Sequence, residues 1–338
     1  MRVIIPMAGM GKRLRPHTLT IPKPLLPIAG KLIVQRLVED IAKVCNEKID
    51  EIAYIIGDFG VEVETRLKDI ASGIGAKGII YYQHEALGTA HAIICAENSL
   101  KGKTIIAFAD TLFKADFTLD ESQDGTIWVK KIKNPNAFGV VSIDADNIIT
   151  GFVEKPETFI SDLAIIGIYY FKDGKNLKEE IQYIIDNDIK DKGEYQLTSA
   201  LENMKEKGTR FTASPVEEWL DCGNKNATVF TNQRILELSR ENGLISKTLK
   251  SKDSTIAEPC YIGENVRIVN SVIGPFVSIG DNTVIENSHI INSIIQTNAK
   301  IISANLDNSM IGNFVEYRGK GKGEESRDVS IGDYSVIC

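Results

Sequence analysis

Glycines and fixed cations lie close together near the start of the chain. A short apolar run, Val3 to Ile5, precedes Gly9 and Gly11, and Arg13 and Lys23 follow them. Glycine lets backbone N–H groups approach a ligand closely, and successive N–H groups can form a nest for phosphate oxygens. Arginine can bind two phosphate oxygens at once, whereas lysine acts as a point charge. These residue types and spacings predict a loop that binds a polyphosphate.

Two familiar glycine motifs do not fit this loop. The dinucleotide fingerprint needs a third glycine where this chain has Leu14, and the P-loop needs Ser or Thr where it has Arg13. A bare Gly-x-Gly turn is as often purely structural as it is part of a binding site. The longer pattern is more specific: it runs from Gly9 through Thr18 and continues into Pro22-Lys23-Pro24.

This longer pattern resembles the signature of the sugar-1-phosphate nucleotidyltransferases, also called nucleotide-sugar pyrophosphorylases. The resemblance implies that Ala8, Gly9 and Gly11 contact the triphosphate of a nucleoside triphosphate. It also implies that Arg13 and Lys23 are the catalytic cations.

A second segment resembles the base-recognition segment of that family, Gln-x-Glu-x-Leu-Gly-Thr, here beginning at Gln83. From the residues alone, Thr89 could be a helix N-cap and Gly88 a close backbone approach, within a plain strand–turn–helix. The resemblance implies that Gln83, Gly88 and Thr89 bind the nucleotide. It further implies that Gln83 and the Gly88 backbone read uracil or thymine, because a Gln amide supplies one acceptor and two donors.

Two aspartates follow apolar segments. Asp110 ends the run Thr104 to Ala109, and Asp221 lies in the segment Trp219 to Gly223. Either could simply cap a helix or a turn. The resemblance implies instead that both hold a divalent metal ion, Mg²⁺, although the family usually has glycine where this chain has Ala109.

Two segments, Phe138 to Val141 and Val153 to Pro156, resemble the sugar-phosphate site of the family, and Gly167 on a further strand could lie against the sugar. In that site a carboxylate accepts hydrogen bonds from hydroxyls and an ammonium neutralises phosphate. Alone, a Glu-Lys-Pro triplet is usually a solvated turn. The residues implied for sugar-phosphate binding are Gly139, Glu154, Lys155 and Gly167.

The elements that must position these residues alternate between strand and helix over the first 110 residues. This alternation predicts an α/β fold, with a Rossmann-like, mostly parallel mixed sheet covered on both faces. Ligands of such sheets bind beyond the carboxyl ends of the strands. We expect strands at 52–56, 78–82, 104–109 and 164–170, and helices at 34–44, 61–70, 90–100, 176–186, 198–207 and 228–241.

Beyond residue 254, isoleucines recur every five or six residues and Asn-Ser pairs recur at turns. This period predicts a β-helix and resembles the left-handed hexapeptide-repeat type. We therefore expect a catalytic domain at 1–245 and a β-helix at 246–338, with a loop leaving the β-helix at 317–328. Because a solenoid cannot bury its own ends, we also expect a homo-oligomer formed through the β-helix.

Composition excludes several classes of protein. The chain has 338 residues, a formal net charge of −7 and 43% hydrophobic residues, as ordinary globular proteins do. A nucleic-acid partner would favour a basic face, so the negative net charge argues against such a partner. No apolar stretch approaches the ~20 residues of a membrane span, and the N-terminal apolar run is too short for a signal peptide. Five scattered cysteines indicate free thiols and a cytoplasmic location.

The resemblance covers nearly the whole chain and implies an enzyme that condenses a sugar-1-phosphate with a nucleoside triphosphate and releases pyrophosphate. Glucose-1-phosphate with dTTP or UTP is the favoured pair. Two alternatives stay open: a non-catalytic regulatory paralogue, and a bifunctional enzyme with an acyltransferase site in the repeats. That chemistry commonly uses a histidine base, and the repeats contain His289 alone.

Overall fold

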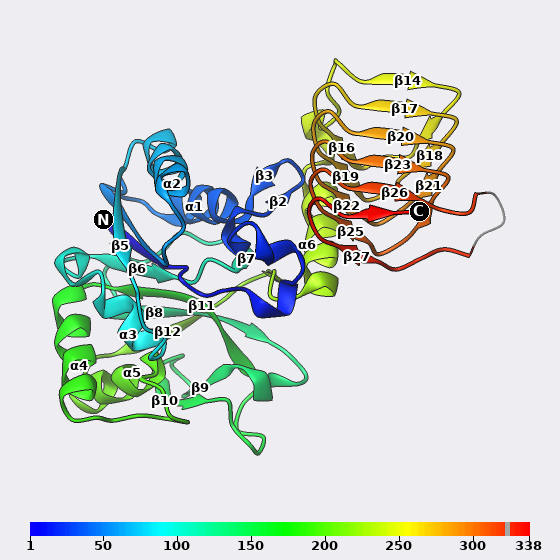
Figure 1. Cartoon of the computed structure of the whole chain (residues 1–338). Coiled ribbons are helices and arrows are strands. Elements are labelled where there is room, and N and C mark those ends of the chain that lie inside the picture. Colours follow the sequence, from blue (N-terminus) through cyan, green and yellow to red (C-terminus); the bar gives the residue numbers. More distant parts are fainter. Residues whose placement is uncertain (322–324) are drawn as a thin grey trace. The chain divides into compact units, whose positions relative to one another are not determined.

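The computed structural model describes residues 1–321 and 325–338. The described chain forms two compact units (Figure 1). The first comprises Met1–Gly9 and Leu37–Trp219, and the second comprises Met10–Arg36 and Leu220–Cys338. Most of the glycine-rich segment thus belongs to the unit that contains the β-helix. The boundary at residue 245 stays a proposal about which parts of the chain fold by themselves.

A mixed sheet forms the centre of the first unit, as predicted. Its strands lie in the order β10-β9-β11-β6-β1-β4-β5, while β8 pairs with β11 and β12 pairs with β8. The pairs around β1 are parallel, whereas β11 runs antiparallel to β6, β8 and β9. The bounds are β1 Arg2–Pro6, β4 Glu51–Ile56, β5 Lys77–Tyr82, β6 Thr104–Ala107, β8 Gly125–Lys131, β9 Gly139–Ile143, β10 Ile149–Glu154, β11 Leu163–Phe171 and β12 Phe211–Pro215.

Helices cover both faces of this sheet because its central strands are apolar on both sides. On one face, Ile4 and Ile106 pack in a core with residues of α3, α4 and α5. On the other face, Gly78 lies against Lys68 and Ala71 of α2. The bounds are α1 Ile33–Val44, α2 Val61–Gly73, α3 Thr89–Ile94, α4 Gly174–Asp186 and α5 Leu197–Glu206.

Two predicted elements are shorter in the structure. The helix expected at 90–100 ends at Ile94 and is followed by a separate 3₁₀ turn, Glu97–Ser99. The strand expected at 104–109 ends at Ala107, and the chain then turns before β7 (Thr111–Lys114). β7 and β13 (Glu218–Asp221) form a small sheet of their own. The turn between β6 and β7 contains Asp110, so the early end of β6 determines where this carboxylate lies.

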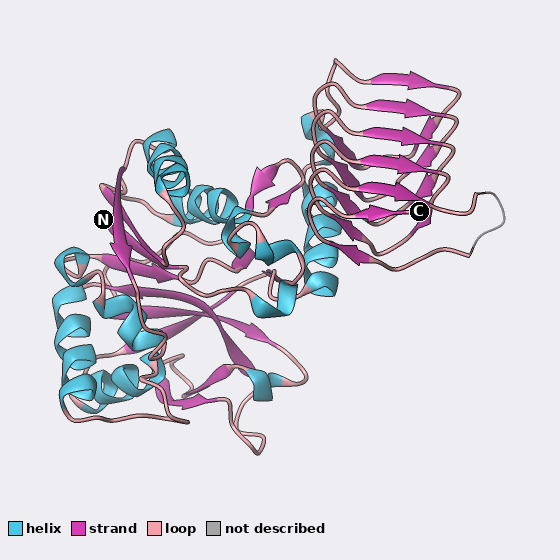
Figure 2. Ribbon diagram, in the orientation of Figure 1, coloured by secondary structure: helices cyan, strands magenta, loops and turns pink. Residues whose placement is uncertain are grey.

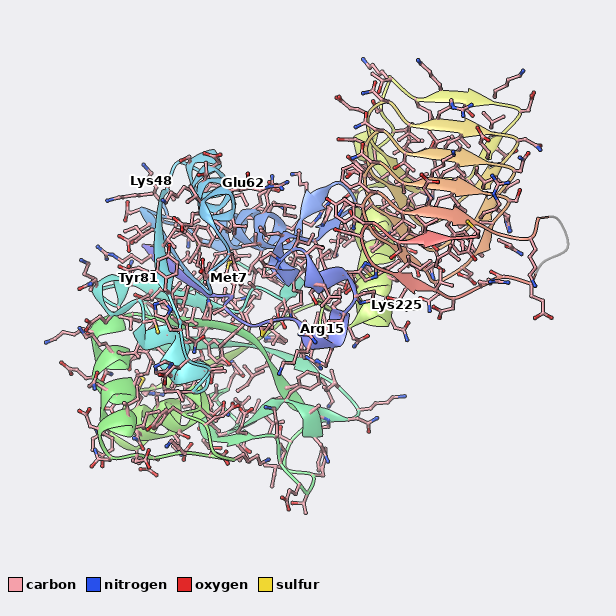
Figure 3. All side chains as sticks on the ribbon, viewed as in Figure 1. Met7, Arg15, Lys48, Glu62, Tyr81 and Lys225 are labelled. Atoms are coloured by element: carbon pink, nitrogen blue, oxygen red, sulfur yellow. The ribbon has the colours of Figure 1, made fainter. Side chains whose placement is uncertain are left out.

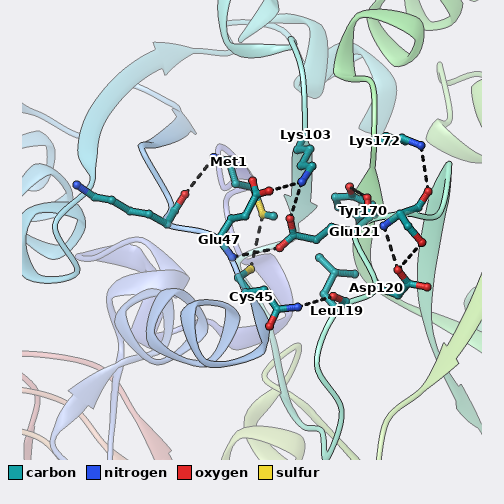
Figure 4. Close-up of polar contacts among 12 residues, drawn as sticks. Met1, Cys45, Glu47, Lys103, Leu119, Asp120, Glu121, Tyr170 and Lys172 are labelled. Atoms are coloured by element: carbon teal, nitrogen blue, oxygen red, sulfur yellow. Dashed lines mark hydrogen bonds and ion pairs between the residues drawn. The ribbon is translucent and has the colours of Figure 1, made fainter.

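A polar cluster lies at the amino ends of the central strands (Figure 4). Lys103, directly before β6, forms ion pairs with Glu47 and Glu121. Tyr170 donates a hydrogen bond to the Glu121 carbonyl at 2.9 Å. These two glutamates raise the pKa of Lys103. The cluster therefore joins segments at the sheet edge opposite to the carboxyl ends of the strands, where ligands bind.

The second unit contains a β-helix, shown in Figure 2 as stacked strands joined by turns. Three parallel sheets form its sides, as expected for the left-handed hexapeptide type. Equivalent residues on successive coils are 16 or 17 residues apart, and 20 residues apart at the last coil. The strands are β14 Lys250–Lys252, β15 Thr255–Ile256, β16 Cys260–Ile262, β17 Arg267–Val269, β18 Val272–Ile273, β19 Val277–Ile279, β20 Val284–Glu286, β21 His289–Ile290, β22 Ile294–Ile295, β23 Lys300–Ile302, β24 Asn305–Leu306, β25 Met310–Ile311, β26 Glu316–Arg318, β27 Ser330–Ile331 and β28 Val336–Ile337.

The recurring isoleucines fill the interior of these coils, as the period predicted. Ile268, Ile285 and Ile301 are fully buried on successive coils. The turns use asparagine with positive φ, as at Asn282 and Asn298, because Asn tolerates this left-handed region better than most residues. The loop expected at 317–328 begins later, because Tyr317 is buried within β26. Residues 322–324 of that loop lie outside the described residues.

One helix and several short elements complete the second unit. α6 spans Lys225–Leu238 instead of the expected 228–241, and the Asn224 side chain accepts a hydrogen bond from Ala227 N at 3.1 Å. Two short strands, β2 (Pro27–Ile28) and β3 (Lys31–Leu32), pair antiparallel. All five cysteines are free thiols. Among the described residues, every helix is too short or too polar to traverse a bilayer.

Candidate active site

The carboxyl end of β1 begins the candidate site in the first unit. Met7 is buried, and its N–H donates to the Ile55 carbonyl at 2.8 Å (Figure 3). Ala8 is half-buried and Gly9 is exposed. A Cβ at Gly9 would have no atom within 4 Å, so open space surrounds this backbone. The backbone after β1 is thus accessible, as phosphate binding requires.

Gly88 allows the start of α3 to lie directly against another segment. Its φ is 120°, and an added Cβ would lie 2.7 Å from Tyr195 N and 2.9 Å from Tyr195 C. Tyr195 N donates to the Leu87 carbonyl, and Ala90 N donates to the Tyr195 carbonyl, both at 2.9 Å. Glycine is therefore required here for packing, whether or not its backbone also contacts a base.

Thr89 does not have the capping role that its position suggested. Gly88 is the N-cap of α3, and Thr89 is the first helical residue. The Thr89 hydroxyl accepts a hydrogen bond from Leu197 N at 2.8 Å and donates to Gln196 Oε1 at 3.1 Å. Gln83, which precedes α3, has its Nε2 atom 3.3 Å from Nδ1 of His91, a residue of α3. The structure thus brings Gln83, Gly88 and Thr89 together around the start of α3.

Three of the four residues implied for sugar-phosphate binding, all except Gly167, gather at the start of β9 and the end of β10. Glu154 Oε1 lies 3.2 Å from Lys155 Nζ, and Thr198 Oγ1 donates to Glu154 Oε2 at 3.3 Å. A Cβ on Gly139 would lie 3.1 Å from Glu154 Oε2. Lys155 has a positive φ of 43°. This backbone conformation is costly for lysine, and it is consistent with a functional position.

Gly167 lies beside the turn that contains Asp110. Phe108 N donates to the Gly167 carbonyl at 2.9 Å, and Thr111 Oγ1 donates to the Ile166 carbonyl at 2.8 Å. Gly167 interrupts the pairing register of β11 between Ile165 and Tyr169 and has a φ of 88°. β11 and the end of β6 therefore hold the Asp110 turn from two sides.

The second unit brings Arg13, Asp221 and Gly223 together. Gly223 N donates to Asp221 Oδ1 at 3.0 Å. A Cβ on Gly223 would lie 3.2 Å from Arg13 Nη2 and 3.0 Å from each Asp221 oxygen. Gly11 has a φ of 57°, and its carbonyl accepts a hydrogen bond from Thr18 Oγ1 at 2.8 Å. Lys23 begins the third of three short 3₁₀ turns in this segment.

Three residues that contribute to these arrangements were not predicted as site residues. Tyr195 contacts Gly88, Thr198 contacts Glu154, and Gly223 contacts Arg13. Tyr195 precedes α5 and Thr198 lies in its first turn, and neither position had a signal stronger than its composition. Gly223 follows Asp221 by two residues, and a glycine beside a candidate ligand was the one signal available for it.

The donor chemistry of the two aspartates fits a hard divalent cation. Carboxylate oxygens are the ligands that Mg²⁺ prefers. Within residues 1–321 and 325–338, no group of three or more His, Cys, Asp or Glu side chains could hold a metal ion. A two-carboxylate site therefore needs substrate phosphates and water as its remaining ligands, as Mg²⁺ sites commonly use.

A buried histidine predicts a pH effect on stability. His17 is 1% exposed, and burial lowers its pKa to about 4, although the Asp333 charge acts in the opposite direction. Between pH 6.5 and 4 the unfolded chain binds the proton more tightly than the folded chain. The free energy of unfolding should therefore fall as pH decreases through this window, by up to roughly 3 kcal/mol.

Urea unfolding followed by circular dichroism at pH 7 and pH 4.5 measures the loss of unfolding free energy. It should be smaller in His17→Gln, and an equal loss in both proteins would contradict this origin.

Comparisons with known proteins show which proteins this chain is similar to. The sequence profile of a family described as nucleotidyl transferase matches residues 2–237. A glucose-1-phosphate thymidylyltransferase of Streptomyces griseus is 25% identical over 99% of this chain and 98% of its own length. The bifunctional protein GlmU of Methanococcus maripaludis is 30% identical over 76% of this chain and 60% of its own.

A solved structure shares the fold of about two thirds of the chain. The nucleoside-diphosphate-sugar pyrophosphorylase of Vibrio cholerae RC9 superposes with a TM-score of 0.60 at 19% identity. The superposition covers 68% of this chain and 99% of the other.

Proposed function

Since the chain belongs to the nucleotidyl transferase family, we propose that it condenses a sugar-1-phosphate with dTTP or UTP. Glucose-1-phosphate is the favoured sugar phosphate, because a thymidylyltransferase named for it aligns with this chain over nearly its whole length. The products are a nucleotide-sugar and pyrophosphate. The observation that carries the proposal is the assembly of Glu154, Lys155 and Gly139 beside one another within a chain that has the nucleotidyltransferase fold.

In the proposed reaction, an oxygen of the sugar phosphate attacks the α-phosphorus of the nucleotide. The new P–O bond forms as the bond between the α-phosphorus and the bridging oxygen to the β-phosphate breaks, and pyrophosphate leaves with that oxygen. Arg13 and Lys23 stabilise the charge on the triphosphate. Glu154 accepts hydrogen bonds from sugar hydroxyls, and Lys155 neutralises the sugar phosphate. No general base is needed, since the attacking phosphate is already anionic.

We propose that Asp110 and Asp221 together hold one Mg²⁺ ion. When bound, such an ion neutralises phosphate charge and orients the triphosphate for in-line displacement. Gly223 N donates to one Asp221 oxygen, which fixes the orientation of this carboxylate. The turn at the end of β6, held by Gly167, fixes the backbone of Asp110.

A screen for pyrophosphate release tests the proposal. The purified chain is mixed with Mg²⁺, each of dTTP, UTP, GTP, CTP and ATP, and a panel of sugar-1-phosphates. We expect turnover to be highest with dTTP or UTP and glucose-1-phosphate. Absence of turnover with every pair would refute the proposal and favour a non-catalytic paralogue. Turnover restricted to GTP would overturn the assigned base preference.

Lys155→Ala should raise KM for the sugar phosphate far more than KM for the nucleotide. A lost charge-assisted contact to phosphate costs about 1.5–3 kcal/mol, or roughly 10- to 100-fold in affinity. Steady-state kinetics with each substrate varied in turn measures the two values. Lys175→Ala removes an exposed lysine of α4 that pairs with Glu179, and should change neither KM. A rise in the nucleotide KM alone would mean that Lys155 contacts the nucleotide and would contradict its assignment to the sugar phosphate.

Gln83→Ala should weaken the preference for pyrimidine over purine triphosphates. A polar site rejects a base that leaves its buried groups unpaired, and removal of the Gln83 amide removes part of that penalty. The expected loss of discrimination is about 5- to 50-fold. Competition between dTTP and GTP reports the ratio of kcat/KM values. If the ratio does not change, other groups read the base.

The bifunctional alternative has one specific observation in its favour besides the similarity to GlmU. His289 is exposed on the β-helix, with Nδ1 3.2 Å from Asn305 Oδ1, and both residues line a cavity of about 350 Å³. Incubation with acetyl-CoA and an amino-sugar phosphate tests this alternative. Release of free CoA thiol that His289→Ala abolishes would support it.

We also propose a homo-oligomer that forms through the β-helix, without nucleic acid or membrane as a partner. The support is that the coils end in exposed side chains, Tyr334 and Val336, which are 68% and 67% exposed. The free thiols support a reducing, cytoplasmic location.

A further inference from the structure

On the last coil of the β-helix, Gly332 lies against the glycine-rich segment, whereas Gly280 and Gly312 on earlier coils lie against the next coil. At Gly280 and Gly312, an added Cβ would press on the next coil, 2.7 Å from Thr297 N and 2.6 Å from Asp333 N respectively. At Gly332 the same added atom would lie 2.9 Å from Cβ of Pro16. Pro16 therefore occupies the place that the following coil occupies elsewhere in the solenoid.

Side chains of the last coil also bind the residues that follow Pro16. His17 Nε2 lies 3.1 Å from Ser330 Oγ, and Thr20 Oγ1 donates to Asp333 Oδ2 at 2.8 Å. Asp333 Oδ1 accepts a hydrogen bond from Asn313 N at 2.7 Å, which joins the last two coils. One carboxylate thus links the body of the β-helix to the segment 16–20.

The other end of the glycine-rich segment is attached to the same unit. Ala29 N donates to Asn232 Oδ1 at 3.2 Å, and Ser278 Oγ of the β-helix donates to the same oxygen at 2.6 Å. Asn232 is fully buried in α6. A Cβ on Gly30 would overlap the ring of Tyr261, so these two residues are in close contact.

The part of the chain from Lys12 to Leu25, which contains both cations, has little regular structure of its own. It consists of three 3₁₀ turns of three residues each, at Lys12–Leu14, His17–Leu19 and Lys23–Leu25. Such short turns have few internal hydrogen bonds and do not fix a conformation alone. Arg13 is exposed, whereas His17 in the same segment is buried. The orientation of Arg13 and Lys23 therefore depends on what holds the segment from outside.

We propose that the last coil of the β-helix is a positioning element for the catalytic cations. Ser330, Gly332 and Asp333 hold the segment 16–20, and this attachment orients Arg13 on one side and Lys23 on the other. In return, the segment covers an edge of the last coil, as a capping repeat does in other solenoids. The proposal rests on the proposed function, because it takes Arg13 and Lys23 as catalytic residues.

Proteolysis of the intact chain tests the attachment without any assay of activity. Trypsin cleaves after Lys12 and Arg13, and mass spectrometry measures the rate of cleavage at each. We expect Thr20→Val and Ser330→Ala each to accelerate cleavage by about 2- to 10-fold and the double variant by about 10-fold or more, because cleavage follows the open population of the loop. Thr248→Val is the matched control, since it removes a hydroxyl that accepts a hydrogen bond from Asn265 N at 2.8 Å at the other end of the β-helix. An unchanged rate in the double variant would overturn the proposal.

Kinetics then tests whether the attachment serves catalysis. Thr20→Val and Ser330→Ala should lower kcat/KM for the nucleotide by about 5- to 10-fold, whereas Thr20→Ser should retain the wild-type value and Thr248→Val should leave it unchanged. Accelerated cleavage with unchanged kcat/KM would refute a positioning role. If the wild-type chain turns over no substrate pair, the proposed function fails, while cleavage still decides whether the last coil holds the loop. Should the double variant not fold, Thr20→Val gives the same readouts with the β-helix residues intact.

Discussion

Asp110→Asn and Asp221→Asn are each expected to lower kcat by roughly 100- to 10,000-fold, because Lewis-acid stabilisation by a metal ion contributes several kcal/mol. Asparagine keeps the shape of aspartate and removes the charge that binds a cation. The fold should persist, since Asp110 lies in a turn and Asp221 at the end of a short strand. A titration of turnover with Mg²⁺ should show a weaker dependence in both variants.

The double variant distinguishes one shared ion from two separate sites. Two carboxylates brought together without a cation would repel each other, whereas one divalent ion removes this conflict. If both hold the same ion, Asp110→Asn/Asp221→Asn should be little worse than either single variant, since the residues act as a unit. Asp173→Asn is a suitable control, because asparagine can also cap α4 there. Strictly additive losses, or full activity in excess chelator, would exclude a shared ion.

Arg13→Ala is expected to lower kcat by roughly 100- to 1,000-fold, the usual cost of removing one donor aimed at developing charge. Arg13→Lys should recover part of the loss, because lysine keeps the charge but not the two-pronged donor geometry. Steady-state kinetics for pyrophosphate release measures both variants. The nucleotide KM should change less than kcat if Arg13 acts mainly in the transition state.

A neighbouring arginine provides the control for Arg13. Arg15 is also exposed and lies two residues further along the same segment. Arg15→Ala should leave kcat within about twofold, as surface substitutions outside a site usually do. Comparable losses from Arg13→Ala and Arg15→Ala would indicate that the net charge of the loop matters more than one aimed guanidinium.

The local patterns of the sequence predicted most of the fold. The apolar runs before Gly9 and Gly57 became β1 and β4, and the isoleucine period became the interior of the β-helix. These signals depend on residues that are neighbours in sequence, so they can be detected without knowledge of the tertiary structure. The same local patterns misplaced element ends, as at Ile94, because the end of a helix depends on capping contacts that composition barely encodes.

The residues of the candidate site also fall into two groups, those that local motifs predicted and those that only contacts between distant segments reveal. The sequence predicted Gln83, Asp110, Glu154 and Lys155 as site residues, and each prediction came from a short motif around that residue. It did not identify Tyr195 or Thr198, since their contacts with Gly88 and Glu154 join segments that are far apart in the chain. Backbone groups that serve as partners, such as those of Tyr195, have no residue-type signal at all.

The amino-acid sequence alone predicts the chemistry proposed for this protein, because glycines, cations and carboxylates at fixed spacing carry that information locally. The contacts that hold the glycine-rich loop, in contrast, become visible in the folded chain. His17 and Ser330 are 313 residues apart in sequence, and neither segment has a pattern that specifies the other. Their contact arises because the chain returns along the stacked coils to the loop near its beginning, and a pairing over that separation is encoded in the fold as a whole.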